Sequence, residues 1–269
     1  MDMINPFIEV TKVIMRRYPA VVPLLKGNAA RFYCEHKAVE RDPGEPGYEE
    51  KNSYQRKIQR ALSARLKRQL EQVSAALDNK GFFVNGVYIE DVPDENSKLV
   101  KLIYDAILAG TVIAQEDIGV FLPDGVLNQY ALQAAREYVT DWLEKLDSTT
   151  QDAIRQAVET FVSKPGTTVG DVISILEPTF GSARAERIAV TETTRVFALG
   201  NDIYAKELQA QYPDMEVIRQ WWTNNDDRVC PICGPLHGKQ AKRGETFDGI
   251  ANPPAHVNCR CWTSVTVKA

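Results

Sequence analysis

The sequence predicts an α+β protein in which a mainly helical N-terminal body leads, through one long helix, into a small antiparallel β unit. Three observations support this fold class. Apolar residues recur every three or four positions in stretches between residues 53 and 211, β-branched and aromatic residues flank a segment near the C-terminus, and that segment holds four of the five cysteines. Because short strands bury little core, we expect a zinc-type Cys/His site to staple the β unit.

Composition limits the classes of function. The chain has 269 residues, of which 44% are hydrophobic and 25% charged, so it can bury a sizeable core and form two units. A net charge of −4 argues against a protein that coats nucleic acid over its whole surface. No run approaches the roughly 18 apolar residues of a membrane span, and the first residues lack a signal-peptide core. We therefore expect a protein of the reducing cytoplasm with no membrane partner.

Residues 1–166 are predicted to form a helical N-terminal region. A basic amphipathic helix is expected over about residues 53–79, and Asn85-Gly86 predicts a hairpin over about residues 81–92. Between Ser53 and Leu70 there are six basic residues and no acid. Such a face can bind a phosphate backbone or an acidic protein, or it can simply be solvated. The candidate nucleic-acid-binding residues are Arg56, Lys57, Arg60, Lys67 and Arg68.

Further helices are expected over residues 97–122 and 126–146. The first should be broken near Gly110-Thr111, and Ser148 should begin another helix that runs to about Val162. The Pro/Gly-containing segment 163–170 is the predicted linker, which places the second region at residues 167–269.

The second region should begin with a short helix capped by Thr168 and stopped near Pro178. A long helix from Ser182 should follow and end before Pro213. Glu192 falls on the apolar stripe of the long helix, where a carboxylate must be paired. Arg195, one turn later, is the expected partner in a structural charge pair.

The cysteines form two short hooks. Cys230 and Cys233 make a C-x-x-C hook, and after 25 intervening residues Cys259 and Cys261 make a C-x-C hook, with His256 three residues before it. This layout suits tetrahedral zinc, with Cys230, Cys233 and Cys259 as firm ligands and Cys261 or His256 as the fourth. His237 is a sixth donor, and disulfides or inert buried thiols are the alternatives. Strands expected before the first hook and after the second would bring the hooks together by pairing.

These motifs resemble those of the phage Mu F-like head-morphogenesis (minor head, or minor capsid) protein family over about residues 165–265. The resemblance consists of the run RAERIAVTETTRVFALGN, then WWTNNDDRVCPICGPLHG, then Glu245-x-Phe247, then PPAHVNCRC. Val257 and Val190 depart from the family pattern, but neither is a metal donor. The matching positions include Thr191, Glu192, Arg195, Trp221, Cys230, Cys233, His256, Asn258, Cys259 and Cys261.

The resemblance implies a non-enzymatic minor head protein of a tailed phage. It would lie inside the virion head near the portal after assembly in the host cytoplasm, and would contact portal protein, scaffold or major capsid protein, with phage DNA as a further candidate. The alternative is a metal-dependent HNH-like nuclease in which His256-x-Asn258 and Asp226 or Asp227 act on DNA. Against it, His256 belongs to the hook that is expected to bind structural Zn²⁺.

Overall fold

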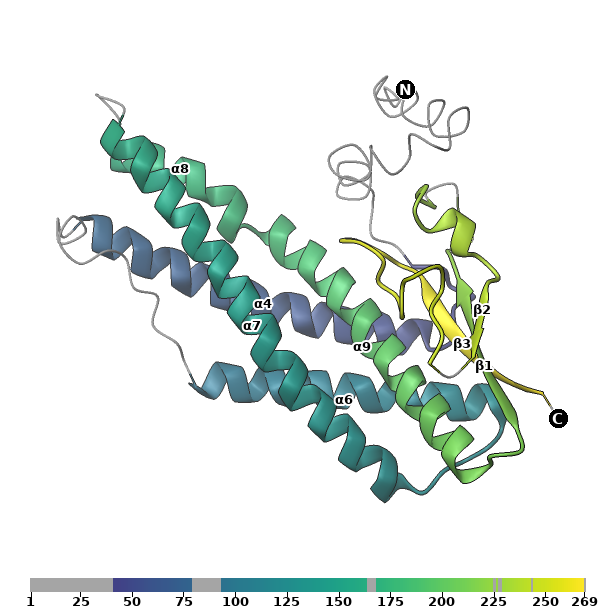
Figure 1. Cartoon of the computed structure of the whole chain (residues 1–269). Coiled ribbons are helices and arrows are strands. Elements are labelled where there is room, and N and C mark those ends of the chain that lie inside the picture. Colours follow the sequence, from purple (N-terminus) through teal and green to yellow (C-terminus); the bar gives the residue numbers. More distant parts are fainter. Residues whose placement is uncertain are drawn as a thin grey trace.

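The computed structural model describes residues 41–78, 93–163, 168–224, 226, 229–242 and 244–268. Within these residues the chain is mostly helical and ends in a small three-stranded sheet, so the predicted fold class is confirmed. Figure 1 shows long helices side by side, with the sheet at the end where α4 begins and α9 ends. The helices are α4 (Tyr48–Asp78), α6 (Pro93–Ile118), α7 (Asp124–Ser163), α8 (Val169–Phe180) and α9 (Ser182–Gln211).

Helix α9 is the centre of the helical body. It packs against α4, α6, α7 and α8, and also against the sheet. Its crossing with α6 is unusually close because glycines meet there: a Cβ on Gly200 would lie 2.9 Å from the Cα of Gly110 and 2.4 Å from the carbonyl oxygen of Ile107. The predicted break in α6 at Gly110-Thr111 is therefore wrong. The helix is continuous, and Gly110 allows α9 to approach.

The predicted helix start at Ser148 is also wrong, because α7 runs without interruption from Asp124 to Ser163. The apolar stripe continues across that point through Leu143, Leu146 and Ile154, which are buried. The hydroxyl of Thr150 donates to the carbonyl of Leu146 one turn back, so this polar residue is satisfied inside the helix. The predicted cap of α8 is confirmed, since Thr168 and Asp171 form a reciprocal capping box.

The two predicted regions share one apolar core. Ile58 and Leu66 of α4 and Ile103 of α6 belong to the same buried cluster as Val196 and Leu208 of α9. The proposed division between residues 166 and 167 lies outside the described residues and stays a prediction. The hairpin predicted over about residues 81–92 also lies outside them. Among the described helices, none combines the length and apolar character needed to cross a lipid bilayer.

The sheet has the order β2-β1-β3 and is antiparallel throughout. Strand β1 (Glu216–Trp222) comes before the first hook and pairs along its whole length with β3 (Trp262–Lys268), so the predicted strand pairing is confirmed. Strand β2 (Gln240–Lys242) was not predicted, because three residues are too few to show an alternating pattern. Trp222 lies opposite Trp262, which places the two hooks beside each other.

Candidate metal centre

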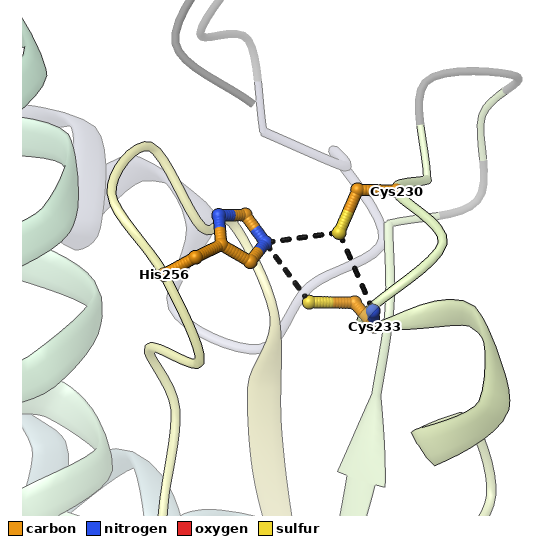
Figure 2. Close-up of side chains that lie close together, drawn as sticks. All are labelled: Cys230, Cys233 and His256. Carbon is orange, nitrogen blue, oxygen red and sulfur yellow. Dashed lines mark hydrogen bonds between the residues drawn. The ribbon is translucent and has the colours of Figure 1, made fainter. Parts of the chain in front are cut away.

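The first hook is a tight turn. The backbone N–H groups of Cys233 and Gly234 both donate to the carbonyl of Cys230, at 3.1 and 2.9 Å. The amide of Cys233 also lies 3.3 Å from the sulfur of Cys230. A short 3₁₀ helix, η2 (Gly234–Leu236), follows at once. Both thiols are buried and converge on the same space, as Figure 2 shows.

His256 completes a triad with these two cysteines. Its Nε2 lies 3.0 Å from the sulfur of Cys230 and 3.1 Å from that of Cys233 (Figure 2). Its Nδ1 lies 2.7 Å from the carbonyl oxygen of Val257, so Nδ1 donates this hydrogen bond and Nε2 is the nitrogen that faces the two sulfurs. Burial lowers the pKa of His256, but the contacts with Cys230 and Cys259 outweigh it and raise the pKa to about 11. The donor set therefore favours a positive charge at its centre.

Cys233 also belongs to a second triad, which it forms with Cys259 and Cys261. The three sulfurs all lie within 4.8 Å of one another. The sulfurs of Cys233 and Cys259 are 3.8 Å apart. Two thiolates bound to one tetrahedral zinc, with Zn–S bonds of about 2.3 Å, are expected at about 3.8 Å. The structure thus places all five predicted donors in two triads that share Cys233, and these groups are positioned to hold a metal ion.

The donors lie in an apolar shell beneath the sheet. Trp221 is fully buried and packs edge-on against Phe247, with ring centroids 5.4 Å apart. Leu236 and Ala241 belong to the same buried cluster as the four cysteines of the hooks. This shell keeps bulk water from the sulfurs and strengthens their attraction to a cation.

Arg41 brings a positive charge to the same place. It is buried, and its guanidinium donates to the carbonyl of Val190 at 3.2 Å and to the hydroxyl of Thr194 at 3.0 Å. Burial lowers the pKa of Arg41, whereas the charges of Glu45 and of the Cys259 and Cys261 thiolates act in the opposite direction. A fixed cation beside these thiolates offsets part of the negative charge that a thiolate-rich metal site carries.

Helix α9 holds the second hook through hydrogen bonds to its backbone. Thr194 donates from its hydroxyl to the carbonyl of Cys259 at 2.7 Å, and Thr191 accepts from the backbone N–H of Asn258 at 3.0 Å. Further along the helix, the side-chain amide of Asn201 donates to the carbonyl of Thr263. The segment that carries Cys259 and Cys261 is thereby fixed to the helical body.

Glu192 and Arg195 lie beside these contacts. The Nε of Arg195 donates to a carboxylate oxygen of Glu192 at 3.1 Å. Burial raises the pKa of Glu192, and the nearby charge of Arg195 only partly opposes this. Sequence reasoning singled out this pair but missed the roles of Arg41, Thr194 and Asn201. Polar side chains among the buried positions of α9 were the one available signal.

Other proposed site residues belong to neither triad. His237 is exposed, and its Nδ1 lies 2.8 Å from the hydroxyl of Thr223, so it belongs to neither triad. Both carboxylate oxygens of Asp226 accept from the buried Arg260, at 2.7 and 3.3 Å. Asp227 lies outside the described residues.

The predicted basic residues lie on α4. Arg56, Lys57, Arg60 and Lys67 are exposed and Arg68 is half-buried. Arg65, in contrast, is buried and joins three helices, because its guanidinium donates to Asp147 of α7 at 2.9 Å and to Asn96 of α6 at 3.0 Å. Two of the exposed basic residues have partners on α4 itself: Lys57 Nζ lies 4.5 Å from the centroid of the Tyr54 ring, and Lys67 Nζ lies 3.9 Å from a carboxylate oxygen of Glu71.

Comparison with known proteins finds a similarity in the C-terminal part of the chain. No curated protein and no solved structure matches the chain significantly. Residues 149–264 match the family model described as "Phage Mu protein F like protein". The matched segment contains α8, α9, most of the sheet and every residue of the two metal triads. Residues 149–264 are therefore similar to the phage Mu F-like family, which suggests a phage head-related protein.

Proposed function

We propose that this protein is a non-enzymatic minor head protein of a tailed bacteriophage that acts in capsid assembly. It would lie inside the head near the portal. The observation that carries the proposal is the convergence of two distant cysteine hooks and His256 in two triads that share Cys233, fixed to α9 by Thr191 and Thr194. A metal ion bound by these donors would make the C-terminal β unit, which has little apolar core, rigid enough to serve as a docking unit.

The metal that suits these donors is Zn²⁺ in a structural role. Thiolates and imidazole are ligands that zinc prefers, and five donors leave no need for a bound water. Cys230, Cys233 and Cys259 would supply three ligands, and His256 or Cys261 the fourth. The bond from His256 Nδ1 to the carbonyl of Val257 supports His256, because it orients Nε2 toward the sulfurs of the first hook.

The proposed contacts are with other head components, namely portal protein, scaffold or major capsid protein. Phage DNA is a further candidate because Arg56, Lys57, Arg60 and Lys67 line the exposed side of α4. Lysine and arginine side chains in such a row can neutralise successive phosphates. The same row also fits an acidic protein surface, so salt-dependent binding must be measured with both kinds of partner.

The HNH-like nuclease has less support. His256 lies among the cysteines, where binding a structural metal would occupy the nitrogen that a general base needs. The carboxylate of Asp226 is already engaged by Arg260. A plasmid-nicking assay with magnesium or manganese distinguishes the assembly protein from the nuclease. Metal-dependent cleavage that is lost in His256→Ala, with zinc and fold retained, would establish the nuclease instead.

The main test couples metal analysis with assembly. The purified chain is analysed by elemental mass spectrometry, and its co-sedimentation with capsids or portal rings is measured alongside Cys233→Ser. The parent protein should contain about one zinc per chain and sediment with the particles, whereas Cys233→Ser should lose both properties. His237→Ala is the matched control and should keep both, since His237 lies outside the triads. Particle binding that survives complete loss of metal would refute the metal-stapled docking unit.

A further inference from the structure

A groove with an apolar floor and acidic walls lies beside the first turns of α4. It has a volume of about 500 Å³ and is formed by the start of α4 and the C-terminal half of α6. We call it the acidic groove. Its principal lining residues are Gly47, Glu50, Val112, Ile113, Glu116 and Asp117.

The floor of the acidic groove is apolar and partly uncovered. Val112 is 45% exposed, which is high for a β-branched side chain in the middle of a helix that otherwise packs well. Gly47 lies directly against Ile113: a Cβ on Gly47 would come within 2.0 Å of the Ile113 Cδ1, and the φ angle of Gly47 is +68°. Glycine at this position lets the chain turn into α4 while it touches α6. The close contact between Gly47 and Ile113 therefore forms part of the apolar floor of the acidic groove.

The walls carry three negative charges. Glu50, Glu116 and Asp117 are exposed, and within the described parts of the chain none of their carboxylates makes a hydrogen bond or an ion pair. Glu50 lies in the first turn of α4, where the helix dipole favours a negative charge. Glu116 and Asp117 lie in the last turn of α6, where the dipole disfavours it and no basic residue compensates.

These two observations point to the same kind of ligand. The carboxylates of Glu116 and Asp117, at the unfavourable end of a helix dipole, are stabilised by a cation from outside, and the exposed Val112 in the same groove is covered by an apolar side chain. We propose that the acidic groove binds a basic amphipathic segment, with lysine or arginine flanking an apolar residue, from another head component. This inference rests on the proposed assembly function and specifies the chemistry of one partner.

The proposal is tested first on the purified full chain with a synthetic probe. The probe is a short fluorescent peptide of lysine and leucine at helical spacing, and binding is followed by fluorescence anisotropy at two salt concentrations. The variant Glu50→Gln/Glu116→Gln/Asp117→Asn should weaken binding by about tenfold at low salt and by less at high salt. Val112→Ser, which leaves the charge unchanged, should also weaken it.

A charge-matched control distinguishes an effect of the groove on peptide binding from an effect of the protein's net charge. Asp141→Asn/Glu144→Gln/Glu159→Gln removes the same three charges from exposed positions of α7 and should bind the peptide as the parent does. Equal weakening by both triple variants, or no effect of Val112→Ser, would overturn the proposal. Sedimentation velocity is measured in parallel: a concentration-dependent dimer that only the groove variant loses would show that a second copy of the chain occupies the groove, which would also overturn it.

Co-sedimentation with phage heads tests the acidic groove and the proposed assembly function separately. The groove variant should retain zinc, because the acidic groove shares no residue with the metal triads, and should sediment less with heads. A groove variant that binds heads as the parent does refutes the groove and leaves the assembly function standing. Absence of head binding by the parent protein itself would refute the assembly function.

Discussion

The hydroxyl of Thr194 in α9 donates a 2.7 Å hydrogen bond to the backbone carbonyl of Cys259. The same hydroxyl accepts a hydrogen bond from the buried guanidinium of Arg41 at 3.0 Å. One side chain thus connects the second cysteine hook, the centre of the helical body and the segment before α4. The position of the metal donors is therefore set by packing between segments that lie far apart in the sequence.

Thr194→Val should weaken this connection without changing the volume of the side chain. The substitution leaves the Cys259 carbonyl and one Arg41 N–H without their partner in a buried place, which typically costs about 1–3 kcal/mol. We expect a lower thermal midpoint and faster loss of metal to a chelator. Thr140→Val is the control, because the Thr140 hydroxyl bonds only within its own exposed helix turn. Equal chelator sensitivity in both variants would show that Thr194 does not position the hook.

His256→Ala and His237→Ala form a matched pair that identifies the metal ligands. His256 lies 3.0 and 3.1 Å from two sulfurs, whereas His237 bonds to Thr223. If His256 is the fourth ligand, His256→Ala should lower zinc affinity by at least about tenfold, and Cobalt(II) substitution should show a changed visible spectrum. His237→Ala should leave both unchanged. If instead Cys261→Ser lowers affinity and His256→Ala does not, Cys261 is the fourth ligand.

Gly200→Ala should destabilise the helical body. The added Cβ would come within 2.4 Å of the Ile107 carbonyl oxygen and 2.9 Å of the Gly110 Cα, and backbone atoms cannot move aside as a flexible side chain can. Overpacking of this kind typically costs about 1–3 kcal/mol. Chemical denaturation measures the loss. Gly125→Ala, which has no atom within 4 Å of the added Cβ, should be neutral or slightly stabilising.

The sequence predicted the elements well where local pattern decides them, and poorly where tertiary contact decides. The apolar stripe of α9 and the paired hooks could be predicted because helical periodicity and cysteine spacing are local signals in the sequence. The predicted helix break at Gly110 was wrong because the sequence does not distinguish a glycine that lets two helices cross from a glycine that ends a helix. Arg41 and Thr194 could not be assigned, because their partners are 149 and 65 residues away.

Glu192→Gln should make stability less dependent on pH. Burial raises the pKa of Glu192 above its ordinary value of 4.5, so the folded state holds the proton more tightly than the unfolded state does. The stability from this group is therefore full below about pH 4.5 and is lost as the pH rises through the folded-state pKa. The parent should lose stability relative to Glu192→Gln between acidic and neutral pH. Thermal midpoints of both proteins at several pH values measure this, and parallel pH profiles would contradict it.

Charge reversal on α4 tests the basic face. Arg56→Glu/Arg60→Glu/Lys67→Glu should abolish salt-sensitive binding to double-stranded DNA if these side chains contact phosphates, since each neutralised phosphate contributes a slope of about 0.9 to the salt dependence. Fold should be retained, because all three residues are exposed. Arg136→Glu/Lys145→Glu/Arg155→Glu on α7 is the matched control. A gel shift that is equal for both triple variants would assign the DNA contact elsewhere, whereas retained DNA binding with lost head binding would identify the face as a protein contact.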